Sequence, residues 1–311
     1  MKRRSAARGR SGAAGAASAH SSTKRPAAPA PPGHVPERRD AQLLPPTQTN
    51  GGSREGPAAY LYGVVRWPPP WAKSPEAVGE ALGTGVGDPP RLVGVVVVKD
   101  VAALVSRVTP AAIGSGQGVR GLRRDMRAHA NVLNRVVALG GNVLPAAFGL
   151  TFPQGDQLAD RFLRPRHTAL ASHLARLDDA VEVTLKVTYV EGSAIQDVVA
   201  ESPDLARAMG RRAQSLDSKI ELGKRVAQAL RGKRDHDARR LLAALTPVVR
   251  DAKVSEPGAD LSVLNASLLV SRATLPKFDN ALEALSRAAA GRMQFDCVGP
   301  LPPYSFVDLR L

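Results

Sequence analysis

The run Tyr60-Leu61-Tyr62-Gly63-Val64-Val65-Arg66, closed by Trp67-Pro68-Pro69-Pro70, fixes where the folded part of the chain begins. Aromatic and β-branched residues bounded by prolines are typical of a strand. Ser74-Pro75-Glu76 follows, with a capping serine before a proline in the first helical turn, and predicts a short helix to about Leu82. The remaining patterns of this half predict strands at 92–98, 101–108 and 143–150, the first two joined as a hairpin, and a helix over about 122–139. The order is therefore βαββαβ.

The second half of the chain repeats this order. Residues 181–190 alternate apolar and polar side chains, which is the period of a half-buried strand. After Ser202-Pro203-Asp204, an amphipathic helix is expected from about 205 to 245, with Gly232 as a candidate break. The other expected elements are strands at 248–254, 261–272 and 292–298, a helix at 275–290, and connecting helices at 156–163 and 167–177, separated at Pro165.

These patterns predict an α+β fold of two ferredoxin-like (βαββαβ) domains with extra helices, each with helices on one face of a four-stranded sheet. The expected division is a disordered basic tail at 1–56, an N-terminal domain at 57–154, connecting helices at 155–180, a C-terminal domain with a long helix at 181–298, and a proline-rich docking tail at 299–311.

Composition separates residues 1–56 from the rest. The chain has 311 residues and a formal charge of +15, from 43 Lys and Arg against 28 Asp and Glu. The first 56 residues hold ten of these basic side chains, three of the acidic ones and no aromatic residue, so they bury too little apolar area to offset the ordering entropy. A solubilising extension, an organelle transit peptide and a segment attracted to polyanions are the alternatives for this tail.

Several functional classes are excluded or disfavoured. The single cysteine, Cys297, cannot form an intrachain disulfide, and no apolar run approaches the roughly 18 residues of a membrane-spanning helix. Aromatic residues make up 4 %, which disfavours RNA recognition by base stacking. The glycine-rich stretches at 83–87 and 114–118 lack the following Lys-Ser/Thr of a phosphate loop, and we interpret them as flexible turns. No two histidines have the spacing of a metal site.

We therefore expect no catalytic residue, no cofactor and no metal, and a protein that is not an enzyme. Because this topology carries many functions, two other binding classes stay open: a basic RNA- or polyanion-binding module and a small-molecule-binding regulatory module.

The C-terminal run Gly299-Pro300-Leu301-Pro302-Pro303-Tyr304-Ser305-Phe306-Val307 is not explained by a strand or a helix. Its prolines fix φ and cannot donate to a sheet, so the run should be extended and stiff. It is also too apolar to stay in water, and we expect it to lie back across the body, along the seam between the domains. A docking peptide for another chain is the alternative.

Four segments in order resemble the gas vesicle protein F/L family. They are the strand with Tyr60 and Tyr62; the stretch 143–152 with Leu144, Pro145, Phe148 and Gly149; the strand 264–270 with Asn265; and the ending with Gly299, Pro300, Pro302, Pro303, Tyr304 and Phe306. The chain departs from the family pattern at Ala147, where an Arg is usual, and at Leu301, where an aromatic residue is common.

The resemblance implies a non-enzymatic accessory protein of gas vesicle assembly, a minor vesicle component located in the cytoplasm and on the gas vesicle. It implies that the protein binds the small hydrophobic shell protein and limits its aggregation before polymerisation. The partners expected are the shell protein and other gas vesicle accessory proteins, with no specific nucleic acid and no membrane. A shell subunit exposes apolar area and unpaired strand edges, which an edge strand of the first sheet, or a groove between 143–152 and 299–307, could cover.

Overall fold

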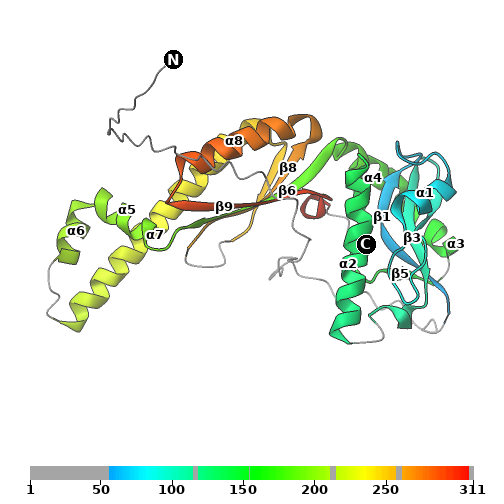
Figure 1. The fold of residues 1–311 in the computed structure, drawn as a ribbon, viewed down its shortest axis with the longest axis horizontal. Coiled ribbons are helices and arrows are strands. Elements are labelled where there is room, and N and C mark those ends of the chain that lie inside the picture. Colours follow the sequence, from blue (N-terminus) through cyan, green and yellow to red (C-terminus); the bar gives the residue numbers. More distant parts are fainter. Residues whose placement is uncertain (1–55, 115–117, 154, 211–214, 257–260, 308–311) are drawn as a thin grey trace, which may run out of the picture. The chain divides into compact units, whose positions relative to one another are not determined.

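The computed structural model describes residues 56–307 except 115–117, 154, 211–214 and 257–260. The tail expected to be disordered lies, up to residue 55, outside the described residues. Two antiparallel sheets follow one another along the chain (Figure 1).

The first sheet is built around β1. Its strands are β1 (Ala58–Arg66), β2 (Gly94–Val98), β3 (Val101–Val108), β4 (Val143–Pro145) and the two-residue β5 (Thr151–Phe152). The order is β2-β3-β1-β4, with β5 also paired to β1. Helices α1 (Pro75–Leu82) and α2 (Val119–Ala138) connect the strands. This order and connection are those of the predicted ferredoxin-like fold, which the structure confirms.

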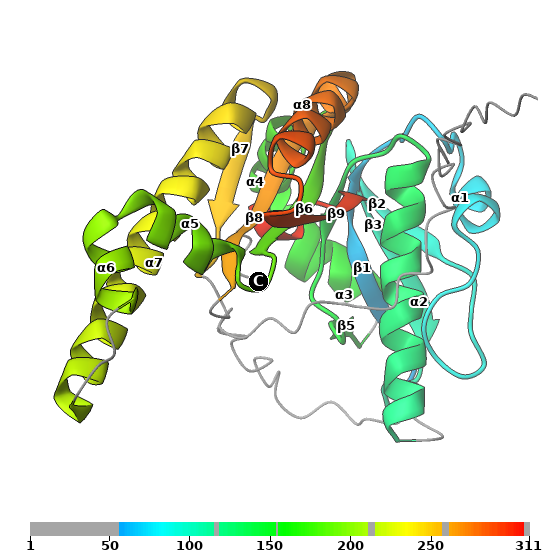
Figure 2. The same cartoon turned by 60° about the vertical axis from the view of Figure 1, so that its left-hand side comes forward.

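Both faces of this sheet are covered, because the side chains of β1 alternate between two cores (Figure 2). Tyr60 and Tyr62 face α1 and α2, whereas Leu61 and Val64 pack against the connecting helices. These are α3 (Gly155–Leu158), a π-helix (Ala159–Leu163) and α4 (Arg164–Arg176). The expectation that helices cover one face only is therefore wrong for the first sheet: the connecting helices form its second layer.

The second sheet has the order β7-β8-β6-β9, from β6 (Ala180–Tyr189), β7 (Asp251–Val254), β8 (Ser262–Ser271) and β9 (Met293–Leu301). Its helices are α5 (Ser193–Glu201), α6 (Pro203–Gly210), α7 (Leu216–Leu245) and α8 (Leu275–Ala288). The apolar side chains of β6 and β8 pack under α7 and α8. The other face carries polar side chains such as Thr184 and Ser267, as the alternation along β6 predicts.

Several expected boundaries are wrong, each for a local reason. The strand expected at 143–150 ends at Pro145, because residues 147–149 bulge out of the ladder and turn at Gly149, whose φ is +90°, before Leu150 and β5 pair with β1 again. Pro165 does not separate two helices, because the π-helix runs directly into α4 with Leu163 and Arg164 both in helical conformation.

The long helix expected over 205–245 is two helices. Ser215 caps α7 by accepting a hydrogen bond from the Ser218 N–H at 3.2 Å, and α7 then continues through Gly232 without a break. The sequence reading missed α5 altogether. The last strand extends three residues beyond the expected end at 298, with a register shift opposite Glu182 that accommodates Gly299-Pro300.

Candidate functional site

The two tyrosines singled out in β1 lie side by side in the first core. They are two residues apart on one strand, so both rings point toward α2, and both are 0 % exposed. Their ring centroids are 4.9 Å apart, and the ring of His129 on α2 lies 5.7 Å from Tyr60 and 5.6 Å from Tyr62. A buried hydroxyl without a hydrogen-bond partner is costly. The partners of the Tyr60 and Tyr62 hydroxyls therefore determine which segments pack around this part of the core.

The hydroxyl of Tyr60 joins β1 to α2 and to the stretch after β4. It donates to His129 Nδ1 at 2.8 Å and accepts from the Gly149 N–H at 3.2 Å. The His129 ring also hydrogen-bonds to the backbone of Ala146, and a neutral imidazole with its proton on Nε2 is the tautomer that lets Nδ1 accept from Tyr60. Phe148 packs edge-on against Tyr60 and His129, at centroid distances of 6.2 and 5.8 Å. The stretch 146–149 is thereby held against the core.

The hydroxyl of Tyr62 joins β1 to the glycine-rich stretch 83–87. It accepts from the Val86 N–H at 2.8 Å and bonds to Ser106 Oγ at 2.8 Å. A Cβ atom on Gly85 would lie 1.7 Å from the Tyr62 oxygen, which leaves no room for any side chain there. The stretch interpreted as a flexible turn is therefore a packed segment whose glycine permits this contact.

Burial shifts the protonation of this cluster. It raises the pKa of Tyr60 and of Tyr62, which stay protonated hydrogen-bond donors. Burial also lowers the pKa of His129 to about 4, and its bond to the Ala146 backbone counters this only in part. The imidazole is thus neutral at pH 7, as its bond from Tyr60 requires.

The C-terminal segment crosses from the second sheet to both cores of the first. Pro302 and Pro303 are buried, and Tyr304 packs against the cluster that contains Tyr60 and Tyr62. Phe306 is 1 % exposed in the other core, where it shares a cluster with residues of β1, α4 and β8. Aromatic residues of the C-terminal segment are therefore part of both cores of the first sheet.

A buried carboxylate anchors this segment. Glu182 of β6 is 3 % exposed and accepts from the Ser305 N–H and from the Ser305 hydroxyl, both at 2.7 Å. Arg176 of α4 donates to the Phe306 carbonyl at 2.6 Å, and Lys253 Nζ lies 5.8 Å from the centre of the Phe306 ring. The sequence reading missed Glu182, whose only signal is a charged residue between two valines in a strand.

Six of the thirteen candidate interaction residues are therefore buried. The buried ones are Tyr60, Tyr62, Leu144, Pro302, Pro303 and Phe306; the half-buried ones are Pro145, Phe148, Asn265 and Tyr304; the exposed ones are Gly149, Gly299 and Pro300. Asn265 lies in β8 opposite Lys186, apart from the tyrosine cluster. A side chain without exposed surface cannot touch a partner in this conformation, and a contact role for the whole set stays a prediction.

An accessible surface of a different kind lies at β2. It is an edge strand whose residues after Gly94 are four consecutive valines. Val93 donates its N–H to the Gly83 carbonyl, away from β3, so by alternation the N–H groups of Val95 and Val97 also point away from β3. No backbone bond on that outer side is recorded for 95–97 among the described residues. The side chain of Val97 is 37 % exposed.

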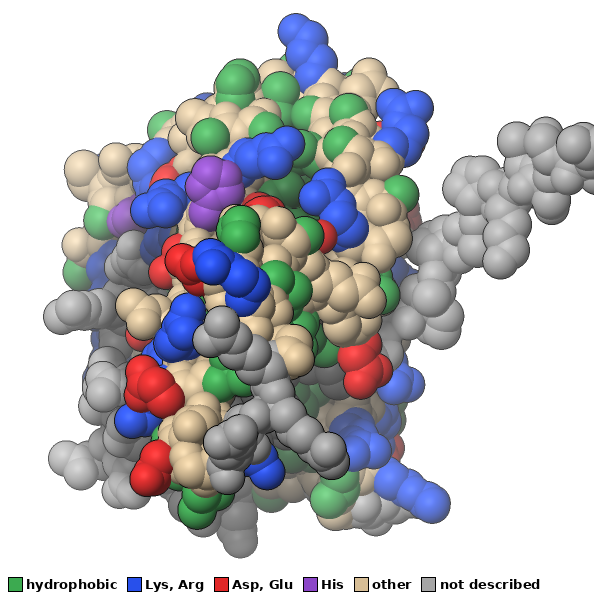
Figure 3. Space-filling model, turned by 90° about the vertical axis from the view of Figure 1, so that its left-hand side faces the viewer, with side chains coloured by type: hydrophobic (Ala, Val, Ile, Leu, Met, Phe, Trp, Pro, Cys, Tyr) green, Lys and Arg blue, Asp and Glu red, His purple; other side chains and the backbone are tan. Residues whose placement is uncertain are grey.

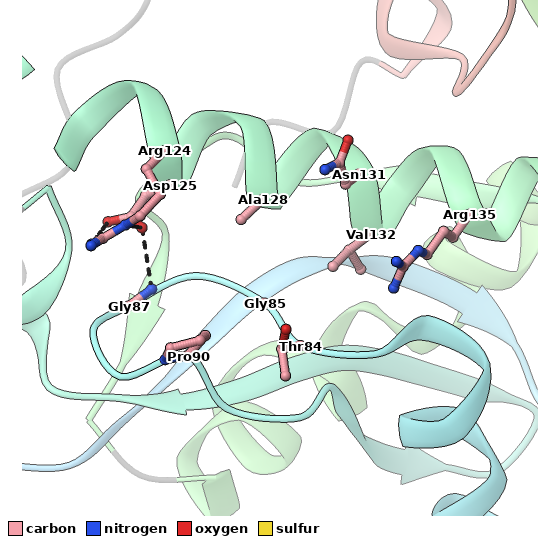
Figure 4. A pocket seen from close by; sticks show the side chains of 10 residues that line it. All are labelled: Thr84, Gly85, Gly87, Pro90, Arg124, Asp125, Ala128, Asn131, Val132 and Arg135. Carbon is pink, nitrogen blue, oxygen red and sulfur yellow. Dashed lines mark hydrogen bonds and ion pairs between the residues drawn. The ribbon is translucent and has the colours of Figure 1, made fainter. Parts of the chain in front are cut away.

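A cavity of about 300 Å³ lies between the 84–90 loop and α2 (Figure 4). Its cationic groups already have partners: Arg124 pairs with Asp88 and Asp125, and Arg135 donates to the Leu82 carbonyl. In Figure 4 the carboxylate of Asp125 points to the Gly87 N–H, which closes the loop onto the helix. The polar groups around the cavity thus hold the 84–90 loop against α2.

Metal-binding clusters and membrane-spanning helices are absent from the described residues. No group of three or more His, Cys, Asp or Glu side chains in that part of the chain is placed to hold a metal ion. No helix within the described ranges is both long enough and apolar enough to cross a membrane.

Comparison with known proteins identifies the family. The family model for gas vesicle synthesis protein GvpL/GvpF matches residues 58–308. Gas vesicle protein F of a Streptomyces species is 35 % identical over 258 residues, covering 81 % of this chain and all of that protein. Gas vesicle protein F of Microcystis aeruginosa is 25 % identical over 192 residues, covering 60 % of this chain and 78 % of that one.

Solved structures agree on the fold. The crystal structure of GvpF from Anabaena superimposes with a TM-score of 0.68 at 20 % identity, over 81 % of this chain and 98 % of that one. The structure of GvpF from Microcystis aeruginosa gives 0.60 at 20 % identity, over 81 % and 99 %. The chain is a gas vesicle accessory protein. It belongs to the GvpL/GvpF family, which confirms the resemblance found in its sequence.

The contact between Gly85 and Tyr62 predicts a large effect of one methyl group. Gly85→Ala should lower the free energy of unfolding by about 2–4 kcal/mol, because Tyr62 must move and its hydroxyl then loses its partners. Gly94→Ala is the matched control, because nothing lies within 4 Å of the added Cβ. This variant should change the free energy of unfolding by less than about 1 kcal/mol. Urea unfolding measures both, and equal stabilities would contradict the packing described.

The buried His129 predicts a pH dependence of stability. Its folded-state pKa, about 4, lies below the unfolded value near 6.5, so between these values the unfolded chain binds a proton that the folded chain does not. Stability should therefore fall as the pH falls from 7, by about 2 kcal/mol at pH 5 from this residue. His129→Gln should lose less stability over the same interval, and parallel pH profiles for the two proteins would refute the assignment.

Proposed function

We propose that the protein binds the gas vesicle shell protein before polymerisation and limits its aggregation by pairing a strand of the shell protein with β2. The observation that carries this proposal is the uncharged valine strand at an open sheet edge. An apolar edge strand with unpaired N–H and C=O groups is a template for another strand, and natural proteins avoid one unless it has a use.

The other sheet edges support the choice of β2, because they carry the usual protection. β7 contains Asp251 and Lys253, and β9 contains Asp296 and Pro300. Charges and prolines on an edge discourage strand addition. The three residues of β4, which end in Pro145, and the two residues of β5 offer too short an edge. Of the edges described, β2 is thus the one suited to accept an apolar strand.

The second surface considered, the groove between 143–152 and the C-terminal segment, is less suited. Tyr304 and Phe306 of this chain already fill it, and opening it would expose the buried carboxylate of Glu182. We therefore assign the family-motif residues to the framework of the first domain and the partner contact to β2.

Two variants of Val97 test the contribution of its side chain and of its backbone N–H to binding of the shell protein separately. Val97→Lys places a charge on the exposed edge, and co-purification with the coexpressed shell protein should fall at least tenfold. Val97→Pro removes only the outward N–H, leaving the bonds to β3, and should weaken binding similarly.

Val254→Lys, at a 56 % exposed valine on the edge strand of the other sheet, is the matched control and should leave co-purification unchanged. Circular dichroism checks that each variant is folded. Recovery of shell protein at the wild-type level by both Val97 variants would contradict the proposed contact.

A further inference from the structure

The helices α5, α6 and the first half of α7, residues 216–233, form what we call the helical arm (Figure 1). The buried residues of α7 begin only at Asp237, in the last third of the helix. Residues 216–233 are all exposed or half-buried, so this half of α7 extends past the sheet that supports the other half.

An ionic cluster around Lys233 links the arm to the second sheet. Lys233 has a 9 % exposed side chain and lies 3.2 Å from Asp197 and 3.5 Å from Glu201, both of α5. It also lies 3.4 Å from Asp237, which accepts a bond from the Tyr189 hydroxyl of β6 at 2.8 Å. Lys233, shared among three carboxylates, links α5 to α7, and the bond between Asp237 and Tyr189 links α7 to β6.

The arm leaves an apolar stripe uncovered. The residues with helical spacing on this face are Leu216, Ile220, Gly223, Ala227 and Leu230, of which Leu230 is half-buried against the core of the second sheet. The same face continues into Leu241 and Leu245, which are buried against the second sheet. Leu216 is nonetheless 72 % exposed and Ile220 48 %. Figure 3 shows this end of the molecule, where apolar side chains lie between Lys and Arg side chains.

We propose that a second copy of this chain covers the stripe, with the two α7 helices antiparallel about a two-fold axis near Gly223. The stripe has large side chains in its first half, Leu216 and Ile220, and small residues in its middle, Gly223 and Ala227. An antiparallel pair places Ile220 of one copy over Ala227 of the other and Leu216 beside Leu230, so large residues meet small ones near the centre. A parallel pair would place Ile220 against Ile220 and leave the small residues facing each other.

The charges beside the stripe favour the same direction. Asp217 flanks the first half of the stripe, Lys224 its middle and Arg231 its second half. The antiparallel register brings Asp217 of each copy near Arg231 of the other, whereas a parallel register places Asp217 beside Asp217 and Arg231 beside Arg231; Lys224 lies near Lys224 of the other copy in either register. The largest segment outside the described residues, 1–55, is rich in Lys and Arg and poor in aliphatic residues, so it suits the stripe poorly.

One helix pair of this length buries less than a standard interface of about 1,600 Å², so the dimer should be weak, with a dissociation constant on the order of micromolar. Sedimentation equilibrium of the full chain from 1 to 100 μM should then show a monomer–dimer equilibrium. The double variant Leu216→Glu and Ile220→Glu should stay monomeric throughout.

The matched control is Leu122→Glu with Met126→Glu, two exposed apolar residues at the same spacing on α2, and it should dimerise like the wild type. Asp217→Arg should weaken the dimer at least fivefold, and adding Arg231→Asp should restore it. A monomeric wild type, or a dimer unaffected by Leu216→Glu with Ile220→Glu, would overturn the proposal.

A disulfide test locates the axis. In a Cys297→Ser background, Gly223→Cys introduces one thiol at a position with nothing within 4 Å of its Cβ. Mild oxidation should convert this variant to a covalent dimer, whereas Arg225→Cys, about half a helical turn around α7, should cross-link much more slowly. Equal cross-linking of both would contradict an axis at Gly223. Because β2 is not involved, shell-protein co-purification by the stripe variants should be normal, so the two proposals fail separately.

Discussion

The hydroxyl groups of Tyr60 and Tyr62 set the constraint on which the first domain depends. Each is fully buried, and a buried hydroxyl left without a partner costs about 1–3 kcal/mol. Their partners come from α2, from the stretch after β4 and from the 83–87 loop, so these separate segments can take only one arrangement. Tyr304 packs on the same cluster, which extends the constraint to the end of the chain.

This constraint explains why the large side chains that carry the family likeness are buried or half-buried. The two tyrosines, Leu144, Phe148 and the aromatic residues of the C-terminal segment pack into the two cores of the first sheet, which His129 helps to join. The anchor at Glu182 ties the C-terminal segment to the second sheet as well. The recognisable motifs thus build the framework, and the surfaces proposed for partners, β2 and the helical arm, lie outside them.

Much of the fold follows from the sequence, because strand patterns, proline-started helices and the βαββαβ order are local signals. The features that the sequence did not predict depend on contacts between distant parts of the chain. The end of β4 at Pro145 depends on bonds from residues 146–149 to the tyrosine cluster, and the second helical layer depends on which face of the sheet the connecting helices choose. The anchoring role of Glu182 needs its partner Ser305, 123 residues away. For the same reason, motif residues could be identified from sequence but not divided into buried and exposed.

Hydrogen exchange across residues 92–98, with and without the shell protein, tests the central claim most directly. The outward N–H groups of Val95 and Val97 have no recorded backbone partner within the part of the chain described, so they should exchange quickly in the free protein and slowly once a shell strand is paired with β2. Unchanged exchange in this segment, with bound shell protein protecting another surface, would contradict the account.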